Sequence, residues 1–139
     1  MNEFMIKLQT LVLSAIGSIL GDRYTFGHPV GRPVFPYVCI FDGTSGPPDY
    51  STGLIQVETK SIQFNVYAHD DVTMDDLLDK IERVLCGHPN VGRLYGSTFK
   101  HLSTRRGSRQ GYEEEVDDID AQSVWHGVMQ IDFELQRNF

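Results

Sequence analysis

The feature that most constrains the fold is an alternation of apolar and polar residues in the segment 124–136. In an extended strand, successive side chains point to opposite faces, so residues two apart share a face. The apolar face would hold Trp125, Met129, Ile131, Phe133 and Leu135. The polar face would hold Val124, His126, Gln130, Asp132 and Glu134. Such a strand predicts an antiparallel sheet that is solvated on one face and covered by helices on the other.

Other segments supply the remaining elements. Apolar residues recur at spacings of three and four over residues 3–20, which predicts a helix that ends at Gly21. A second helix is predicted from a cap at Thr73, with Asp76 in its first turn, to a stop at Gly87. Strands are predicted over 36–41, 54–69 and 97–104.

The long strand region 54–69 contains a change of parity. Ile55 and Val57 are odd-numbered, whereas Ile62, Phe64 and Val66 are even-numbered. Because residues of one face must keep one parity, this change predicts a bulge or bend near residues 60–61.

Together these segments predict an α+β fold with the element order α-β-β-α-β-β. We expect a mainly antiparallel sheet of about four or more strands packed with two helices. The chain has 139 residues, so a single domain over 1–139 is expected. A long charged loop over 105–123 is predicted between the last two strands.

Negative charge is concentrated in that loop. The chain carries 19 acidic and 12 basic residues, and six of the acids lie in the eight positions 113–120. The 22 residues before this run contain five basic residues and no acid. Structureless loops of this length are usually functional or disordered. A basic arm followed by an acidic one suits head-to-tail contact between identical subunits, although a solvated connector would show the same pattern.

We therefore take the charged residues of this loop as candidates for a subunit interface or a channel lining. They are Arg105, Arg106, Arg109, Glu113, Glu114, Glu115, Asp117, Asp118 and Asp120.

Other classes of site lack support in the sequence. There is no nucleophile elbow, phosphate-binding loop or dinucleotide fingerprint, so we expect no catalytic residue and no cofactor. The densest metal-like cluster, residues 69–71, is better explained by acids that precede a helix N-terminus, so we expect no metal. Cys39 and Cys86 are expected to be buried free thiols, as in cytoplasmic folding. No apolar run approaches the roughly 18 residues of a membrane span, so no membrane contact is expected.

The element order and several short motifs resemble the phage tail terminator, or tail completion, family of long-tailed phages. The matching pieces are spread over residues 3–136. They begin with an N-terminal helix and the run Val34-Phe35-Pro36-Tyr37-Val38-Cys39-Ile40, which is like the family's FPxVxV first strand. The others are the alternating strand 61–68, the acidic helix start 71–76, the hairpin loop 105–120 and the last strand 125–135.

This resemblance implies an α+β structural virion protein without catalytic activity. Members of the family form a ring, typically a hexamer, that caps the finished tail tube and stops polymerisation of the tube protein. The ring also offers a surface to the head completion or connector protein and lets DNA pass through its channel. The implied location is the head-proximal end of the virion tail, after assembly in the host cytoplasm. An acidic lining would repel the phosphates of the passing DNA.

Three alternatives stay open. A head-tail connector or neck protein shares the size and ring symmetry of a terminator. A small cytoplasmic enzyme or metal-binding protein would use His69, Asp70 and Asp71. A binding module could use the acidic run to mimic DNA toward a basic partner.

Overall fold

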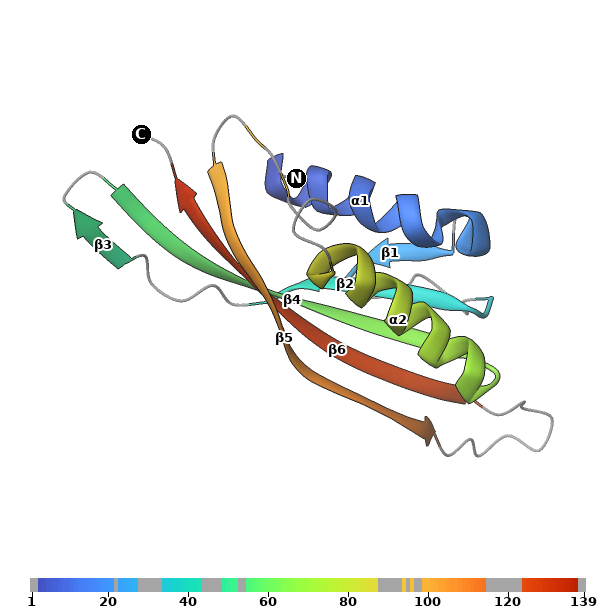
Figure 1. Ribbon diagram of the computed structural model, residues 1–139. Helices are drawn as coiled ribbons and strands as arrows, with labels where there is room; N and C mark the ends of the chain where they lie inside the picture. Colours follow the sequence, from blue (N-terminus) through green and yellow to red (C-terminus); the bar gives the residue numbers. More distant parts are fainter. Residues whose placement is uncertain are drawn as a thin grey trace.

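The structure, a computed structural model, describes residues 3–21, 23–27, 34–43, 49–52, 55–87, 94, 96, 99–114 and 124–137. Within these residues, two helices and six strands follow one another (Figure 1). They are α1 (Glu3–Leu20), β1 (Tyr24–Phe26), β2 (Tyr37–Asp42), β3 (Asp49–Thr52), β4 (Ile55–Ala68), α2 (Asp71–Cys86), β5 (Phe99–Glu114) and β6 (Val124–Arg137).

All six strands form one sheet in the order β1-β2-β4-β6-β5, with β3 paired to β4. Every described pairing is antiparallel except that of β1 with β2, which is parallel. The predicted α+β class and its mainly antiparallel sheet are therefore confirmed. The predicted order of elements lacked β1 and β3, which have only three and four residues.

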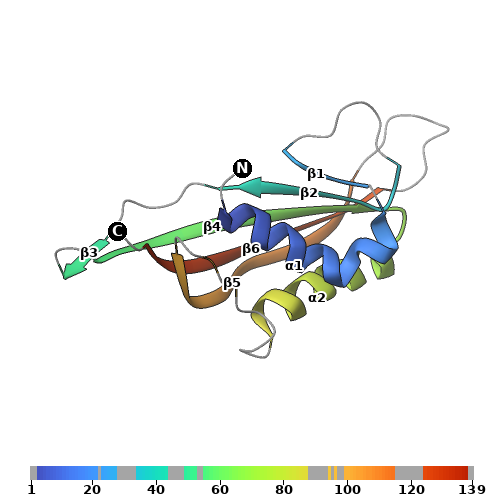
Figure 2. The ribbon, with the colours of Figure 1, turned by 90° about the horizontal axis from the view of Figure 1, so that it is seen from above.

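Both helices lie on one side of the sheet, as Figure 2 shows. We call this side the helix-covered face and the opposite side the open face. The predicted apolar residues Met129, Ile131, Phe133 and Leu135 of β6 are fully buried on the helix-covered face. In β4, Ile62 lies opposite Ile131 and Phe64 opposite Met129, so two apolar rows run side by side beneath the helices.

Helix α1 occupies the residues that its periodicity predicted. Its buried side chains include Phe4, Leu8, Val12, Ile16 and Leu20, which recur every four residues. The helix ends before Gly21, whose φ of 61° is a left-handed conformation that glycine adopts readily. The apolar stripe of α1 therefore forms one layer of the core.

Aromatic contacts anchor the start of α1 to the sheet. The Phe4 ring makes edge-to-face contacts with Phe99 of β5 and Phe133 of β6, at centroid distances of 5.7 and 5.2 Å. Such arrangements are the preferred geometry of aromatic pairs and add to the burial of apolar area.

By length and mean hydropathy, α1 also reaches the range of a helix that could cross a membrane. From the sequence, no apolar run was expected to approach this range, and α1 does reach it by length and composition. In this fold six residues of α1 are buried. Its apolar face is therefore already occupied by the core.

The bulge predicted near residues 60–61 is absent, because β4 pairs with β6 without a register shift from Gln56 to Ala68. Lys60, at an even position, lies on the helix-covered face and is only 7% exposed. Its ammonium lies 3.3 Å from Asp42 and 6.0 Å from the centre of the Phe4 ring. A buried lysine therefore occupies the place in the apolar row where the parity seemed to change.

The cap of α2 lies three residues earlier than predicted. Asp70 is the N-cap, and its carboxylate accepts hydrogen bonds from the backbone N–H of Thr73, at 2.7 Å, and from the Thr73 hydroxyl. Thr73 thus donates to the cap and is not the cap itself. The predicted C-terminal stop at Gly87 is confirmed.

Helix α2 packs closely against the sheet at Gly127 of β6. A Cβ atom at this position would lie 2.7 Å from Leu78 Cδ1 and 2.9 Å from Met74 Cγ, both closer than van der Waals contact. We expect Gly127→Val to lower the free energy of unfolding by about 1–3 kcal/mol, as overpacking of a core does. The control is Gly107→Val, because there the nearest atom, Gln130 O, is 3.5 Å away. If chemical denaturation showed equal losses of unfolding free energy in the two variants, this packing would be contradicted.

Asp70 should make stability depend on pH. Hydrogen bonds from Thr73 lower the pKa of Asp70 below its ordinary value of 3.8. A carboxyl group whose pKa is lower in the folded state stabilises the fold above its unfolded pKa, and this contribution is lost as pH falls through the folded pKa. Asp70→Asn keeps a capping acceptor but does not titrate, so its melting temperature should fall less than that of the parent between neutral and acidic pH. If the melting temperatures of the parent and the variant fell equally with pH, the role of Asp70 would be contradicted.

Candidate functional site

The charged segment selected from the sequence is largely strand, not loop. The predicted loop 105–123 was wrong for residues 105–114, because β5 continues to Glu114 and pairs with β6 up to Val124. Arg, Gly, Ser and Gln residues in this half of β5 lack the alternation that marks a strand. Their extended conformation is imposed by the neighbouring strand β6.

Two register shifts decide which way the charges of β5 point. One lies between His101 and Ser103, and the other lies between Arg106 and Arg109. At the second shift, Arg106 pairs with Ile131 and Arg109 pairs with Met129, so β5 advances by three residues while β6 advances by two. One extra residue in such a bulge reverses the parity of the strand beyond it. Arg106 and Arg109 therefore both lie on the helix-covered face, although one number is even and the other odd.

Arg109 is held by three carboxylates of α2. Its guanidinium lies 2.7 Å from Asp79, 2.8 Å from Glu82 and 3.6 Å from Asp75. The side chain is 18% exposed. Partial desolvation lowers the pKa of Arg109, but hydrogen bonds and charge attraction from Asp79 and Glu82 outweigh it, so the net shift is upward. The guanidinium therefore acts as a permanent positive clamp between β5 and α2.

The acids of α2 that meet this clamp are spaced by four and three residues, and therefore lie along one face of the helix. Glu82 also pairs with Arg106, whose Nε lies 3.2 Å from the carboxylate. Without the arginines, these acids would repel one another. Two of the three candidate arginines thus neutralise charge within the subunit.

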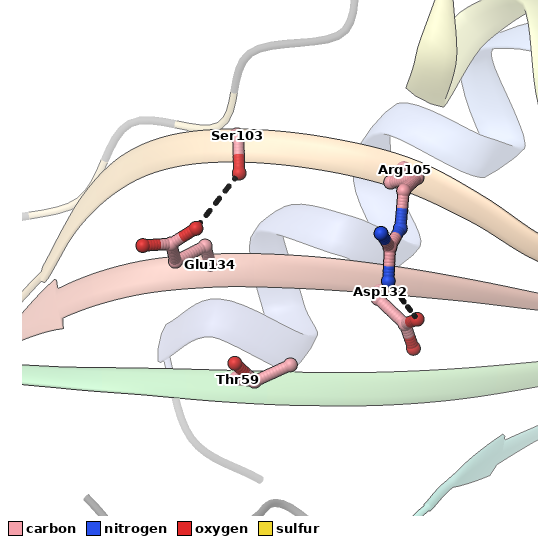
Figure 3. A pocket seen from close by; sticks show the side chains of 5 residues that line it. All are labelled: Thr59, Ser103, Arg105, Asp132 and Glu134. Carbon is pink, nitrogen blue, oxygen red and sulfur yellow. Dashed lines mark hydrogen bonds and ion pairs between the residues drawn. The ribbon is translucent and has the colours of Figure 1, made fainter. Parts of the chain in front are cut away.

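Arg105 points to the open face instead. Its side chain is 82% exposed and lies 3.9 Å from Asp132 of β6. Together with Thr59, Ser103 and Glu134, these two residues line a shallow hollow of about 210 Å³ (Figure 3). At this distance and exposure, the ion pair contributes little to stability.

The acids of the hollow are held by neighbouring hydroxyl groups. Ser61 donates to Asp132 at 2.6 Å, and Ser103 donates to Glu134 at 3.2 Å. Both carboxylates lie on the open face, where the solvent-facing polar row of β6 was predicted. This part of the open face is thus polar and carries charges of both signs.

A second polar group, centred on His126, lies on the open face where β5 ends. His126 Nε2 lies 2.8 Å from Asn65 Oδ1, while its Nδ1 lies 2.8 Å from both the Tyr112 hydroxyl and a Glu114 carboxylate oxygen. The Nδ1 atom can accept from the tyrosine or, when protonated, donate to the carboxylate. His126 and Asn65 are buried, so these contacts satisfy polar groups that water reaches poorly.

Stacked rings extend this group across the sheet. The Tyr67 ring lies 4.3 Å from the His126 ring and 6.2 Å from the Phe35 ring, with interplanar angles of 19° and 15°. Because Tyr67 belongs to β4 and His126 to β6, the stack joins neighbouring strands. Tyr112 and Glu114 are thereby fixed to the rigid part of the sheet, and the acidic run starts from a defined position.

The structure places the candidate residues in three groups. Arg106 and Arg109 meet α2, Arg105 faces the hollow, and Glu113 and Glu114 end β5. Glu115, Asp117, Asp118 and Asp120 lie outside the described residues.

Sequence reasoning did not find the partners of these charges, namely the acids of α2 and the His126 group. The only signal was the presence of polar residues such as His126 on the strand face expected to be solvated.

Other chemistry finds little support in the described part of the chain. No group of three or more His, Cys, Asp or Glu residues there is placed to hold a metal ion. Both cysteines are free, as expected, but only Cys39 is buried, whereas Cys86 is partly exposed. Desolvation raises the pKa of each thiol to about 11. At neutral pH these thiols are protonated and poorly nucleophilic.

The α2 clamp can be tested with two matched substitutions. Arg109→Met should lower the free energy of unfolding by about 1–2 kcal/mol, because charge-assisted hydrogen bonds are lost and three acids are left close together. Added salt should restore part of this loss by screening their repulsion. Arg105→Met should change stability by less than about 0.5 kcal/mol, since its pair is exposed. Both substitutions are measured by denaturant titration at low and high salt. Equal losses of unfolding free energy in the two variants at both salt concentrations would refute the clamp.

Comparison with known proteins rests on structure alone. No family model matches the sequence, and no curated protein does. Among solved structures, a chain from "Virion of native gene transfer agent (GTA) particle" aligns with a TM-score of 0.66 over 94% of this chain and 92% of that chain, at 12% sequence identity. At this identity the likeness shows the fold alone: the present chain has the fold of a component of that virion.

Proposed function

We propose that this chain is a structural virion protein without catalytic activity, which forms a ring, most simply a hexamer, that caps a tail tube. The observation that carries the proposal is the likeness in fold, over nearly the whole length of both chains, to a component of the gene transfer agent virion. The motifs that resemble tail terminators point to the same class. In this role the protein occupies the head-proximal end of the tail after assembly in the host cytoplasm.

A terminator needs three surfaces, for the tube protein, for the neighbouring subunit and for the head completion or connector protein. The β5–β6 hairpin is our candidate for one of them. Its contact residues would be Arg105 on the open face, together with Glu113 and the acids that follow it in the sequence. Head-to-tail contacts between such unlike surfaces generate a closed ring when the rotation from one subunit to the next closes on itself. DNA would pass through the channel of the ring without sequence-specific contacts.

The proposal is tested by mixing the purified protein with tubes assembled from the tail tube protein of the same virus. We expect negative-stain images to show a ring bound at one end of each tube. Capped tubes should stop growing when more tube protein is added. Binding to capsids but not to tubes would favour a connector or neck protein, and a strict monomer that binds neither would overturn the proposal.

The acidic run should act in assembly and not in folding. We expect a variant that combines Glu113→Gln and Glu115→Gln with Asp117→Asn, Asp118→Asn and Asp120→Asn to melt as the parent does, because it retains Glu114 for His126. Its capping of tubes or its yield of infectious particles should fall. A sixth change, Glu114→Gln, serves as the control for the contact with His126. Unchanged capping and yield in both variants would exclude a role for the run.

A further inference from the structure

The outer edge of β5 is the longest strand edge that no other described strand covers. β5 has 16 residues, stands last in the strand order and pairs with β6 on one side only (Figure 1). A long free edge offers a row of backbone donors and acceptors to any second strand. Natural proteins blunt such edges with bulges and charges, and β5 has both.

We propose that the edge of β5 pairs with β5 of a second copy, antiparallel, across a two-fold axis at Gln110. The charges of the strand are arranged for this pairing. Arg105 and Arg106 lie before the bulge, and Glu113 and Glu114 lie on the other side of Gln110. When the bulge is counted as one position, the arginines and the glutamates lie at equal distances from the axis. A two-fold axis places the first half of one strand beside the second half of the other.

The register follows residue by residue from the axis. Gln110 lies opposite the second copy's Gln110, and Gly111 lies opposite the second copy's Arg109. Tyr112 then lies opposite the second copy's bulge, the residues 107–108, which take the place of a single residue as they do against β6. Because Gly111 has no side chain, it leaves room beside an arginine that is already directed to α2.

Beyond the bulge, opposite charges meet. Glu113 lies opposite the second copy's Arg106, and Glu114 lies opposite the second copy's Arg105. Arg106 and Glu113 pair with Ile131 and Trp125 of β6, so both lie on the helix-covered face. Arg105 and Glu114 pair with Asp132 and Val124, so both lie on the open face. The bulge thus brings each glutamate to the same face as its arginine.

Two-fold symmetry doubles these contacts to four arginine–glutamate pairs. The four side chains retain the exposure needed to meet a partner: Arg105 is 82% exposed, Arg106 44% and Glu114 39%, and Glu113 is also exposed. Opposite charges placed directly across a strand pair stabilise it, and like charges destabilise it.

A two-fold contact joins only two copies, and it uses Arg105 and Glu113, which the proposed ring also uses. The dimer would therefore form between free subunits and separate before the ring assembles. It would cover the free edge in subunits that have not yet been assembled. Its test uses the isolated protein, whereas capping is tested with tubes. Failure of one can therefore be told from failure of the other.

Charge reversal tests the pairing. We expect sedimentation equilibrium of the full chain to show a monomer–dimer equilibrium that weakens with salt. An acidic variant, Arg105→Glu with Arg106→Glu, and a basic variant, Glu113→Arg with Glu114→Arg, should each raise the dimer dissociation constant at least about tenfold, because like charges then face each other. A mixture of the two variants should form heterodimers. The variant with all four changes should dimerise as the parent does.

Cross-linking tests the register without altering any charge. Opposite residues in an antiparallel pair have Cβ atoms about 4.5–5.5 Å apart, close to the separation that a disulfide needs. Gln110→Cys should therefore form a disulfide-linked dimer on mild oxidation. Gln63→Cys, which is also exposed but lies on the central strand β4, is the matched control. A parent protein that stays monomeric, dimerisation of either like-charged variant at parental strength, or equal cross-linking of both cysteine variants would overturn the proposal.

Discussion

The rest of the structure depends on the uninterrupted pairing of β4 with β6. Thirteen successive residue pairs, from Gln56 with Arg137 to Ala68 with Trp125, keep one register. Since side chains alternate between faces, a slip by one residue would turn an entire apolar row toward water. The paired rows give α1 and α2 a common surface to cover, and this fixes one face of the sheet as core and leaves the other open.

The extended conformation of β5 is determined by its neighbours more than by its own composition. Its second half is polar and charged, yet it remains extended because β6 pairs with it and Arg109 joins it to α2. The bulge after Arg106 brings Arg109 to the same face as Arg106, toward the helix, whereas Arg105 remains on the open face. A cluster that reads as a single basic arm in the sequence is thus split between internal neutralisation and an exposed surface.

Periodicity predicted the elements that bury a long apolar stripe. The helix over residues 3–20 and the strand that begins at Val124 were both correct, because their buried residues recur without interruption. β1 could not be predicted, since three residues show no period and its parallel pairing with β2 is a tertiary contact. Lys60 suggested a bulge because a buried lysine is indistinguishable in sequence from a solvent-facing one. The charges of the candidate site were located, but their partners on α2 lie about 30 residues away in the chain.

The division of the sheet into a covered and an open face has a consequence for how such a protein can change over evolution. Side chains such as Gln63, Gln130 and Asp132 lie on the open face and take no part in the apolar layer beneath the helices. Substitutions among them can alter what the surface binds while the packing of α1 and α2 stays as it is. A fold of this kind can therefore acquire new neighbours in an assembly, even at very low sequence identity, without rebuilding its interior.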